Sequence, residues 1–257
     1  MGFAIRINGI LPGAGYPKVE DFISLPVVNL VEGWLNRADV ITRDASNLIS
    51  KWVGQKGGEL IQSDATKQPI YNASGFGSKP SVKGDGGDVL VSGVALPQSG
   101  YMVVGLHNTN PSTYGTYEAL MGQEATNQGA AQERLWLGRK TEAGGSIYGV
   151  VFSSQAMSVT SGQDPTMRAY GSKDVVGIKY NAATGAWVLR VNKAAVKSGA
   201  ANALTFSALG VGICGRNMTG TQNYLSKAPT AAGAIYSGDL TAAEMDAIDD
   251  AIARRLA

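Results

Sequence analysis

The stretch from residue 47 to residue 90 constrains the fold of this chain more than any other part. Short apolar pieces (60–61, 70–71 and 89–90) alternate there with clusters of Gly, Asn, Asp, Ser and Pro. This pattern is typical of short β-strands joined by tight turns and has no helical periodicity. Each strand carries too few apolar residues to be stable alone, so a second sheet must cover it. The stretch therefore predicts an all-β protein.

Strand patterns continue along the rest of the chain. Residues 101–107 are almost continuously apolar, which predicts a central strand that is covered on both faces. Residues 132–137 and 145–152 predict a strand pair joined around 142–144. Residues 174–180 and 186–191 predict a hairpin with Gly185 in its turn. Residues 204–214 predict a further strand region.

One helix is expected, at the C-terminal end, over residues 241–256. Thr241 and Glu244 have the spacing of a capping box. Apolar residues then recur every three or four positions up to Leu256, which is the period of a helix with one buried face.

Two long polar segments, 108–131 and 215–232, interrupt these patterns. We interpret both as loops, and long loops in compact domains often carry function. Polar and aromatic residues on such loops are typical of carbohydrate recognition. The candidate ligand-binding residues are Asn108, Asn110, Tyr114 and Tyr117 in the first segment and Asn217, Asn223 and Tyr224 in the second. Packing of the same tyrosines over a sheet edge is the alternative.

A series of short motifs resembles a known family. The series comprises Trp34, Leu35, Ala38 and Asp39, then 67–71 (KQPIY), 77–82 (GSKPSV) and 84–90 (GDGGDVL). In this order they resemble the N-terminal half of concanavalin A-like, laminin-G-type jelly-roll domains. The chain departs from the family at Lys83–Gly84, where an apolar residue usually precedes the Asp-Gly pair. The resemblance extends over residues 31–257 and implies a sandwich of two antiparallel sheets.

The resemblance also implies a setting, because such domains occur in virion proteins of tailed phages and in bacterial surface proteins. It implies a tail-tip, fibre or baseplate component that binds host-surface polysaccharide and forms a homo-oligomer. The alternative is a capsid or tail decoration (cement) protein that binds no receptor. A glycan-cleaving enzyme is the third hypothesis.

The first 30 residues lie outside the resemblance. An alternating piece (3–7) is followed by Pro12, Gly13, Gly15 and Pro17 and then by an apolar, Pro-interrupted piece (22–28). This N-terminal arm is interpreted either as an extra edge strand or as a docking arm that reaches other virion proteins.

The charge distribution argues against nucleic acid as a partner. The formal charge is +2, from 22 Lys and Arg against 20 Asp and Glu, and they are scattered along the chain. Phosphate recognition requires clustered cations.

The N-terminus carries no apolar run that fits a signal peptide, and no segment fits a membrane span. We therefore expect assembly into the virion within the host cytoplasm.

Residues for nucleophilic catalysis are few. His107 is the one histidine and Cys214 the one cysteine, and neither lies in a nucleophile motif. Glycoside hydrolysis requires paired carboxylates on strands, whereas the predicted strands hold almost no acids. Asp249 and its acidic neighbours are assigned to solvent-facing positions of the helix. We therefore expect no enzyme activity.

A calcium site is a further candidate, and no other cofactor is expected. Asp85 and Asp88, separated by two glycines, supply carboxylates from one turn. The alternative is that both acids hydrogen-bond to their own turn.

The tryptophans lie in strand-like patterns and are assigned to the core; they are Trp34, Trp52, Trp136 and Trp187.

Overall fold

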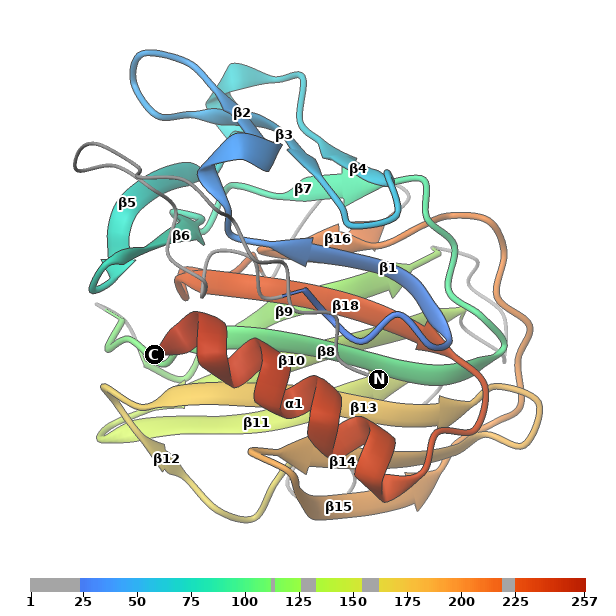
Figure 1. Ribbon diagram of the computed structural model, residues 1–257. Helices are drawn as coiled ribbons and strands as arrows, with labels where there is room; N and C mark the ends of the chain where they lie inside the picture. Colours follow the sequence, from blue (N-terminus) through green and yellow to red (C-terminus); the bar gives the residue numbers. More distant parts are fainter. Residues whose placement is uncertain (1–23, 112–113, 126–132, 154–161, 219–224) are drawn as a thin grey trace, which may run out of the picture.

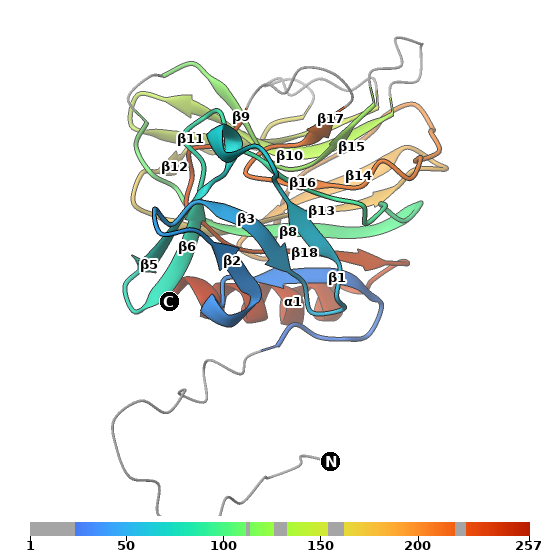
Figure 2. The same cartoon turned by 90° about the horizontal axis from the view of Figure 1, so that it is seen from above.

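The computed structural model describes residues 24–111, 114–125, 133–153, 162–218 and 225–257. Two β-sheets face each other as a sandwich, and one α-helix covers the outer side of the first sheet (Figures 1 and 2). The expected all-β fold with a C-terminal helix is confirmed.

The first sheet, sheet A, has the strand order β15-β14-β13-β8-β18-β6-β5, and β1 also pairs with β18. The strand bounds are β1 Leu30–Leu35, β5 Ile70–Phe76, β6 Lys79–Lys83, β8 Ser99–His107, β13 Lys173–Asn181, β14 Ala186–Val191, β15 Ala194–Ala200 and β18 Thr230–Ser237.

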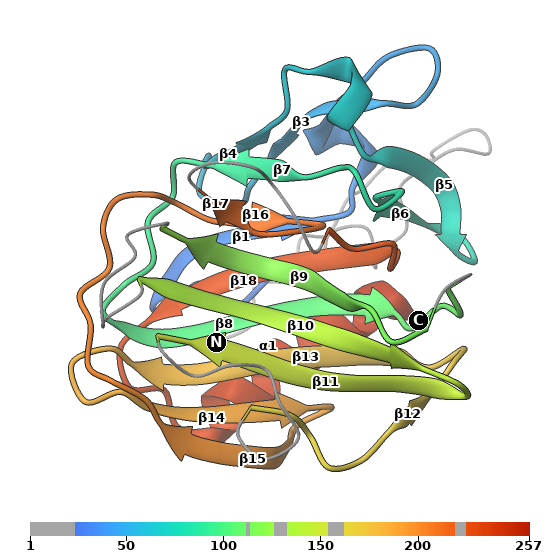
Figure 3. The ribbon, with the colours of Figure 1, turned by 180° about the vertical axis from the view of Figure 1, so that it is seen from behind.

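The second sheet, sheet B, has the order β12-β11-β10-β9-β16-β7-β4-β3-β2 and faces the viewer in Figure 3. Its pairs are antiparallel except for β17, which runs parallel to β9. The bounds are β2 Ile41–Arg43, β3 Ile49–Val53, β4 Glu59–Ile61, β7 Leu90–Ser92, β9 Tyr117–Glu124, β10 Arg134–Glu142, β11 Gly145–Phe152, β12 Arg168–Ala169, β16 Gly212–Ile213 and β17 Asn217–Met218. Two 3-10 turns, η2 (Ala38–Val40) and η3 (Ala65–Lys67), lie between strands.

The main core lies between the sheets, because alternate residues of each strand point inward. In β8, Met102 and Val104 contribute to this core, while Tyr101 and Val103 point to the helix side. The prediction of a central strand covered on both faces is therefore confirmed. All four tryptophans are buried, although Trp136 belongs to a small separate cluster with Ala119 and Val151.

The helix, α1 (Ala242–Leu256), packs across β8, β13 and β18 (Figure 1). Thr241 and Glu244 form the expected capping box. The close approach depends on a glycine, since a Cβ at Gly105 would lie 2.4 Å from Ile252 Cγ2. Within the described part of the chain, no helix has the length and hydrophobicity that crossing a bilayer requires.

The loop prediction for residues 108–131 is wrong in part. Residues 117–124 form β9, a central strand of sheet B that pairs with β10. Glu, Ala, Leu and Met dominate its sequence, and these residues favour helices over strands. Pairing with β10 and burial decide the conformation instead.

The expected division into an arm (1–30) and a domain (31–257) stays a prediction. Residues 1–23 lie outside the described residues, and β1 begins at Leu30. Leu25 is buried against the helix side of sheet A. The side chain of Gln55 fixes the backbone of Leu25 with two hydrogen bonds, at 2.9 and 3.1 Å. The last residues of the expected arm thus pack on the sandwich.

Candidate functional site

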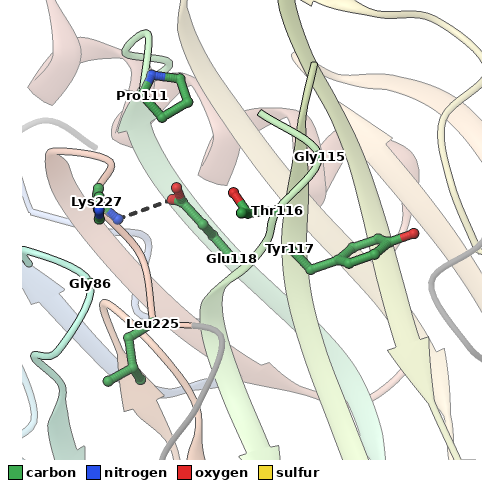
Figure 4. A pocket seen from close by; sticks show the side chains of 8 residues that line it. All are labelled: Gly86, Pro111, Gly115, Thr116, Tyr117, Glu118, Leu225 and Lys227. Carbon is green, nitrogen blue, oxygen red and sulfur yellow. Dashed lines mark hydrogen bonds between the residues drawn. The ribbon is translucent and has the colours of Figure 1, made fainter. Parts of the chain in front are cut away.

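A pocket of about 400 Å³ opens at one edge of the sandwich, where β9 begins (Figure 4). Three separate parts of the chain form its walls: the segment that leads into β9, the turn between β6 and β7, and the segment before β18. The lining residues are Gly86, Pro111, Gly115, Thr116, Tyr117, Glu118, Leu225 and Lys227.

Glu118 is the buried acid of this pocket. Strand alternation directs its side chain into the pocket, while the Tyr117 ring points to the other side of β9 (Figure 4). The Glu118 Oε2 atom accepts hydrogen bonds from Arg139 Nε and Nη2 at 3.0 and 2.9 Å. The Ser226 hydroxyl and the Lys227 backbone N–H donate to the same oxygen at 3.2 and 3.0 Å. Four donors therefore fix the position of one carboxylate oxygen.

Arg139 lies directly opposite Glu118 in the β9–β10 register and is fully buried. Its Nη1 atom also donates to Asn108 Oδ1 and to the Thr109 carbonyl, at 3.0 and 3.1 Å. The guanidinium thus connects the buried acid to the segment that leads to Pro111. This connection holds one wall of the pocket in place.

The turn between β6 and β7 packs closely against the segment before β18. A Cβ at Gly84 would lie 2.5 Å from the Ser226 carbonyl oxygen, so this position requires glycine. Gly86 has a φ of +101° and lies against the side chain of Lys227. The departure from the family pattern at Lys83–Gly84 therefore has a packing reason in this chain.

The four candidate ligand-binding residues of the first segment lie in different environments. Asn108 is fully buried, and its side-chain amide donates to the carbonyls of Arg168 and Ala169, both at 3.0 Å. Its side chain holds the wall of the pocket, and ligand binding by Asn108 stays a prediction. Asn110 is exposed beside Pro111, and Tyr117 lines the pocket.

Tyr114 is 48% exposed and stacks on Tyr170, with ring centroids 6.4 Å apart. It does not line the pocket, although it lies one residue before Gly115, which does. Ligand binding by Asn110, Tyr114 and Tyr117 stays a prediction.

The second segment contributes less than expected to the pocket. Asn217 lies on β17, where its side chain donates to the Leu209 carbonyl at 2.7 Å, and it does not line the pocket. Asn223 and Tyr224 lie outside the described residues. Leu225 and Lys227, which follow them, do line the pocket.

The two acids of the calcium prediction hydrogen-bond within their own turn. Asp88 Oδ2 accepts from the Asp85 N–H at 2.9 Å, and Asp85 Oδ1 accepts from the Gly87 N–H at 2.6 Å. Burial raises the pKa of Asp88 to about 6, although the hydrogen bond from Asp85 opposes this shift. Among the described residues, no three His, Cys, Asp or Glu side chains are grouped to hold a metal ion. Calcium binding at Asp85 and Asp88 stays a prediction.

The reactive residues singled out in the sequence lie away from the pocket lining. Cys214 is fully buried, and burial raises the pKa of its thiol to about 12, which keeps it protonated. His107 ends β8, and burial lowers the pKa of its imidazole.

The expectation that the strands hold almost no acids is wrong. Glu32, Glu118 and Asp174 lie on β1, β9 and β13, and each is at most 4% exposed. In the sequence, each of these acids stands among apolar residues, and that pattern is the signal that could have identified them. The sequence reasoning missed Glu118 and Thr116, because residues 108–131 have the pattern of a loop. It missed Arg139 and Lys227, because their contacts with Glu118 join segments that are distant in sequence.

Comparisons with known proteins identify the fold. No family model matches the chain, and no curated protein matches it. A solved structure of a Trypanosoma rangeli sialidase, bound to a difluorinated nononic acid, is similar with a TM-score of 0.59 and 12% identity. The alignment covers 90% of this chain and 33% of the sialidase. A GH54 α-L-arabinofuranosidase is similar with a TM-score of 0.57 and 17% identity, over 81% of this chain and 51% of that enzyme.

These similarities correct one expectation. We expected no enzyme activity, and the expectation is contradicted because the two solved structures named here come from glycan-cleaving enzymes. The chain spans about a third of the sialidase and half of the arabinofuranosidase. At these identities the likeness concerns the fold and transfers no catalytic residue. The chain is thus similar to β-sandwich parts of carbohydrate-active proteins, consistent with a concanavalin A-like sandwich.

Proposed function

We propose that this protein binds a glycan in the pocket at the start of β9. The observation that carries the proposal is the Glu118 carboxylate, buried in an open pocket and fixed by four donors. A carboxylate that is held in one orientation discriminates between the hydroxyl positions of a sugar, because its hydrogen bonds have defined directions.

The other lining residues complement a sugar. The Thr116 hydroxyl both donates and accepts, and its partner within the protein is Thr141 Oγ1 at 2.9 Å. Gly115 leaves one wall without a side chain, and a Cβ there would meet nothing within 4 Å, so a ligand can approach the backbone. The volume of about 400 Å³ lies within the range of small-molecule sites, roughly 300–1,000 Å³.

The similar structures support a carbohydrate ligand, since both belong to proteins that act on saccharides. Hydrolysis by two carboxylates requires a second acid about 5–9.5 Å from the first. Among the described lining residues, Glu118 is the one acid. Binding is the activity proposed for this pocket, and release of reducing ends measures whether the pocket also hydrolyses the glycan.

The resemblance in sequence supplies the biological setting of this proposal. In a tailed-phage particle, the pocket would bind host-surface polysaccharide, and the N-terminal arm would hold neighbouring virion proteins. Many copies would attach together, so a modest affinity per pocket would suffice. The similar structures supply no link to a phage particle, and the virion location stays a prediction.

A pair of matched variants tests the proposal. Thr116→Trp fills the pocket from an exposed position, and Thr184→Trp makes the same change at an exposed residue of a separate pocket beside β13 and β14. Glycan-array binding and titration calorimetry measure affinity, and released reducing ends measure hydrolysis. Thr116→Trp should reduce glycan affinity at least about tenfold, a change of about 1.4 kcal/mol. Thr184→Trp should leave the affinity unchanged.

Thermal unfolding of both variants checks that the fold is retained. Equal affinities for Thr116→Trp and the unchanged protein would show that the glycan binds elsewhere. No retained glycan on the array would contradict the proposal as a whole.

A further inference from the structure

The charge balance of the pocket depends on two charged lining residues, Glu118 and Lys227. The charge of Glu118 is balanced directly by Arg139, since the two side chains form an ion pair with 6% and 0% exposure. Lys227 has no such partner. Within the described parts of the chain, no carboxylate lies within 4.0 Å of its ammonium group. The pocket therefore carries one uncompensated positive charge.

Lys227 differs in this respect from many lysines of the molecule. Lys51, Lys67, Lys140, Lys179 and Lys193 each contact a carboxylate within 3.2 Å. Two acids lie on the turn that carries Gly86: Asp85 and Asp88 accept hydrogen bonds from N–H groups of that turn.

The position of the ammonium group is set by Gly86. A Cβ at Gly86 would lie 2.5 Å from Cε and 3.5 Å from Nζ of Lys227, so the side chain lies directly against this wall of the pocket. No described residue accepts a hydrogen bond from the backbone N–H of Gly86. This wall thus carries a cation next to a backbone N–H that has no acceptor among the described residues, and such a combination suits an anionic oxygen ligand.

We propose that the pocket selects a saccharide that carries a carboxylate, such as a hexuronic acid, and that Lys227 binds this carboxylate. The inference rests on the proposed function and specifies its ligand class. Glu118 and Thr116 would contact hydroxyl groups of the same sugar. A neutral sugar of the same stereochemistry would leave the Lys227 charge without a partner.

Matched ligands provide the first part of the test. An array of uronic-acid oligosaccharides is compared with the same oligosaccharides after reduction of their carboxylates to alcohols, so that only the charge differs. The acidic forms should bind about 1.5- to fivefold more tightly, the range expected for one solvent-exposed ion pair. The preference should decrease between about 0.05 and 0.5 M salt, because salt screens exposed charges.

Matched variants provide the second part. Lys227→Gln should remove the preference for acidic forms, and Lys227→Arg should retain it. Lys197→Gln makes the same charge change on β15, at the far edge of sheet A, and should have no effect. The two glutamine variants alter partly or fully exposed side chains, so both are expected to fold.

The outcomes separate this inference from the proposed function. Suppose that Thr116→Trp removes glycan binding, but the unchanged protein binds acidic and reduced forms equally. This result would overturn the inference and leave the proposed function intact. A preference for acidic forms that survives in Lys227→Gln would also overturn it. Absence of any binding that Thr116→Trp can remove would overturn both.

Discussion

Two buried carboxylate–arginine pairs lie in different parts of this sandwich, and they differ in what surrounds them. Glu118 and Arg139 lie on adjacent strands of sheet B, next to an open pocket. Asp249 lies on α1 and faces sheet A, where Arg190 Nη2 is 3.5 Å from its Oδ2 and the Tyr101 hydroxyl donates to its Oδ1 at 2.7 Å. Arg190 also binds Asp246, whose side chain is 45% exposed. The first pair holds a pocket wall, and the second attaches a helix.

The comparison shows that a buried ion pair by itself does not indicate a binding site. Burial raises the pKa of Asp249 to about 6, although Tyr101 and Arg190 oppose that shift. Its carboxylate therefore belongs to the packing between helix and sheet. Glu118 is distinguished by its neighbours, since the Thr116 hydroxyl and the Lys227 ammonium line the same pocket. Access from solvent separates the two pairs.

The largest expected effect concerns the arginine of the pocket pair. Arg139→Met leaves Glu118 buried without its counter-charge, and breaking such a pair costs about 3–5 kcal/mol. Arg190→Met should cost less, about 1–3 kcal/mol, because Asp246 is solvated and the Tyr101 hydroxyl still binds Asp249. Urea denaturation measures both free energies of unfolding.

A double variant controls for the uncompensated charge. Glu118→Gln combined with Arg139→Met should recover much of the lost stability, since Gln still accepts from Ser226 and Lys227. Glycan affinity should remain low in this variant. Equal losses in Arg139→Met and Arg190→Met would remove the distinction between the two pairs.

The next effect is a pH dependence at the helix. Asp249 has a pKa of about 6 in the folded protein, against 3.8 as its ordinary value, so the folded state binds more protons between these pH values. Stability should therefore rise as pH falls from about 6 to about 4, and decrease as pH rises through this window. The difference between 3.8 and about 6 corresponds to a change of about 3 kcal/mol in the free energy of unfolding.

Asp249→Asn should flatten this dependence, which chemical denaturation at a series of pH values measures. Asp88 contributes in the same direction, because its pKa is also raised to about 6. Asp88→Asn is therefore the matched variant, and it should remove a separate part of the slope. A stability curve of Asp249→Asn that parallels the unchanged protein would contradict the assignment.

The smallest effect concerns the start of the helix. Thr241→Ala removes the hydroxyl that accepts from the Glu244 N–H and should lower the free energy of unfolding by about 1 kcal/mol. Thr241→Ser keeps the hydroxyl and should change it little. Glycan affinity should be unaffected by both, since α1 does not line the pocket. Weaker binding in Thr241→Ala would show that the helix and the pocket are coupled.

Local patterns predicted several elements correctly. The helix, the β10–β11 pair and the β13–β14 hairpin all lie where the sequence placed them. In each case neighbours in sequence make the deciding contacts: a capping box three residues apart, or strands joined by a turn with a glycine at positive φ, Gly144 or Gly185. Short-range interactions of this kind can be read from residue order.

The predictions failed where distant segments decide the environment. Asp249 was assigned to solvent, yet it is 2% exposed because Tyr101 and Arg190 of sheet A bind it. β9 was assigned to a loop, yet it is a central strand because β10 and β16 pair with it. In both cases the local sequence pattern predicts the wrong environment, because partners from other segments of the chain determine burial and pairing.

Residue order alone is enough to predict an all-β sandwich with one C-terminal helix, because strand alternation, turn glycines and the capping box act over a few residues. The candidate site, in contrast, depends on contacts between distant segments. Arg139 reaches Glu118 across 21 positions and the Lys227 N–H reaches it across 109. Strand register brings these groups together, and register depends on the packing of both sheets. The pocket therefore arises from long-range pairing that no local motif encodes.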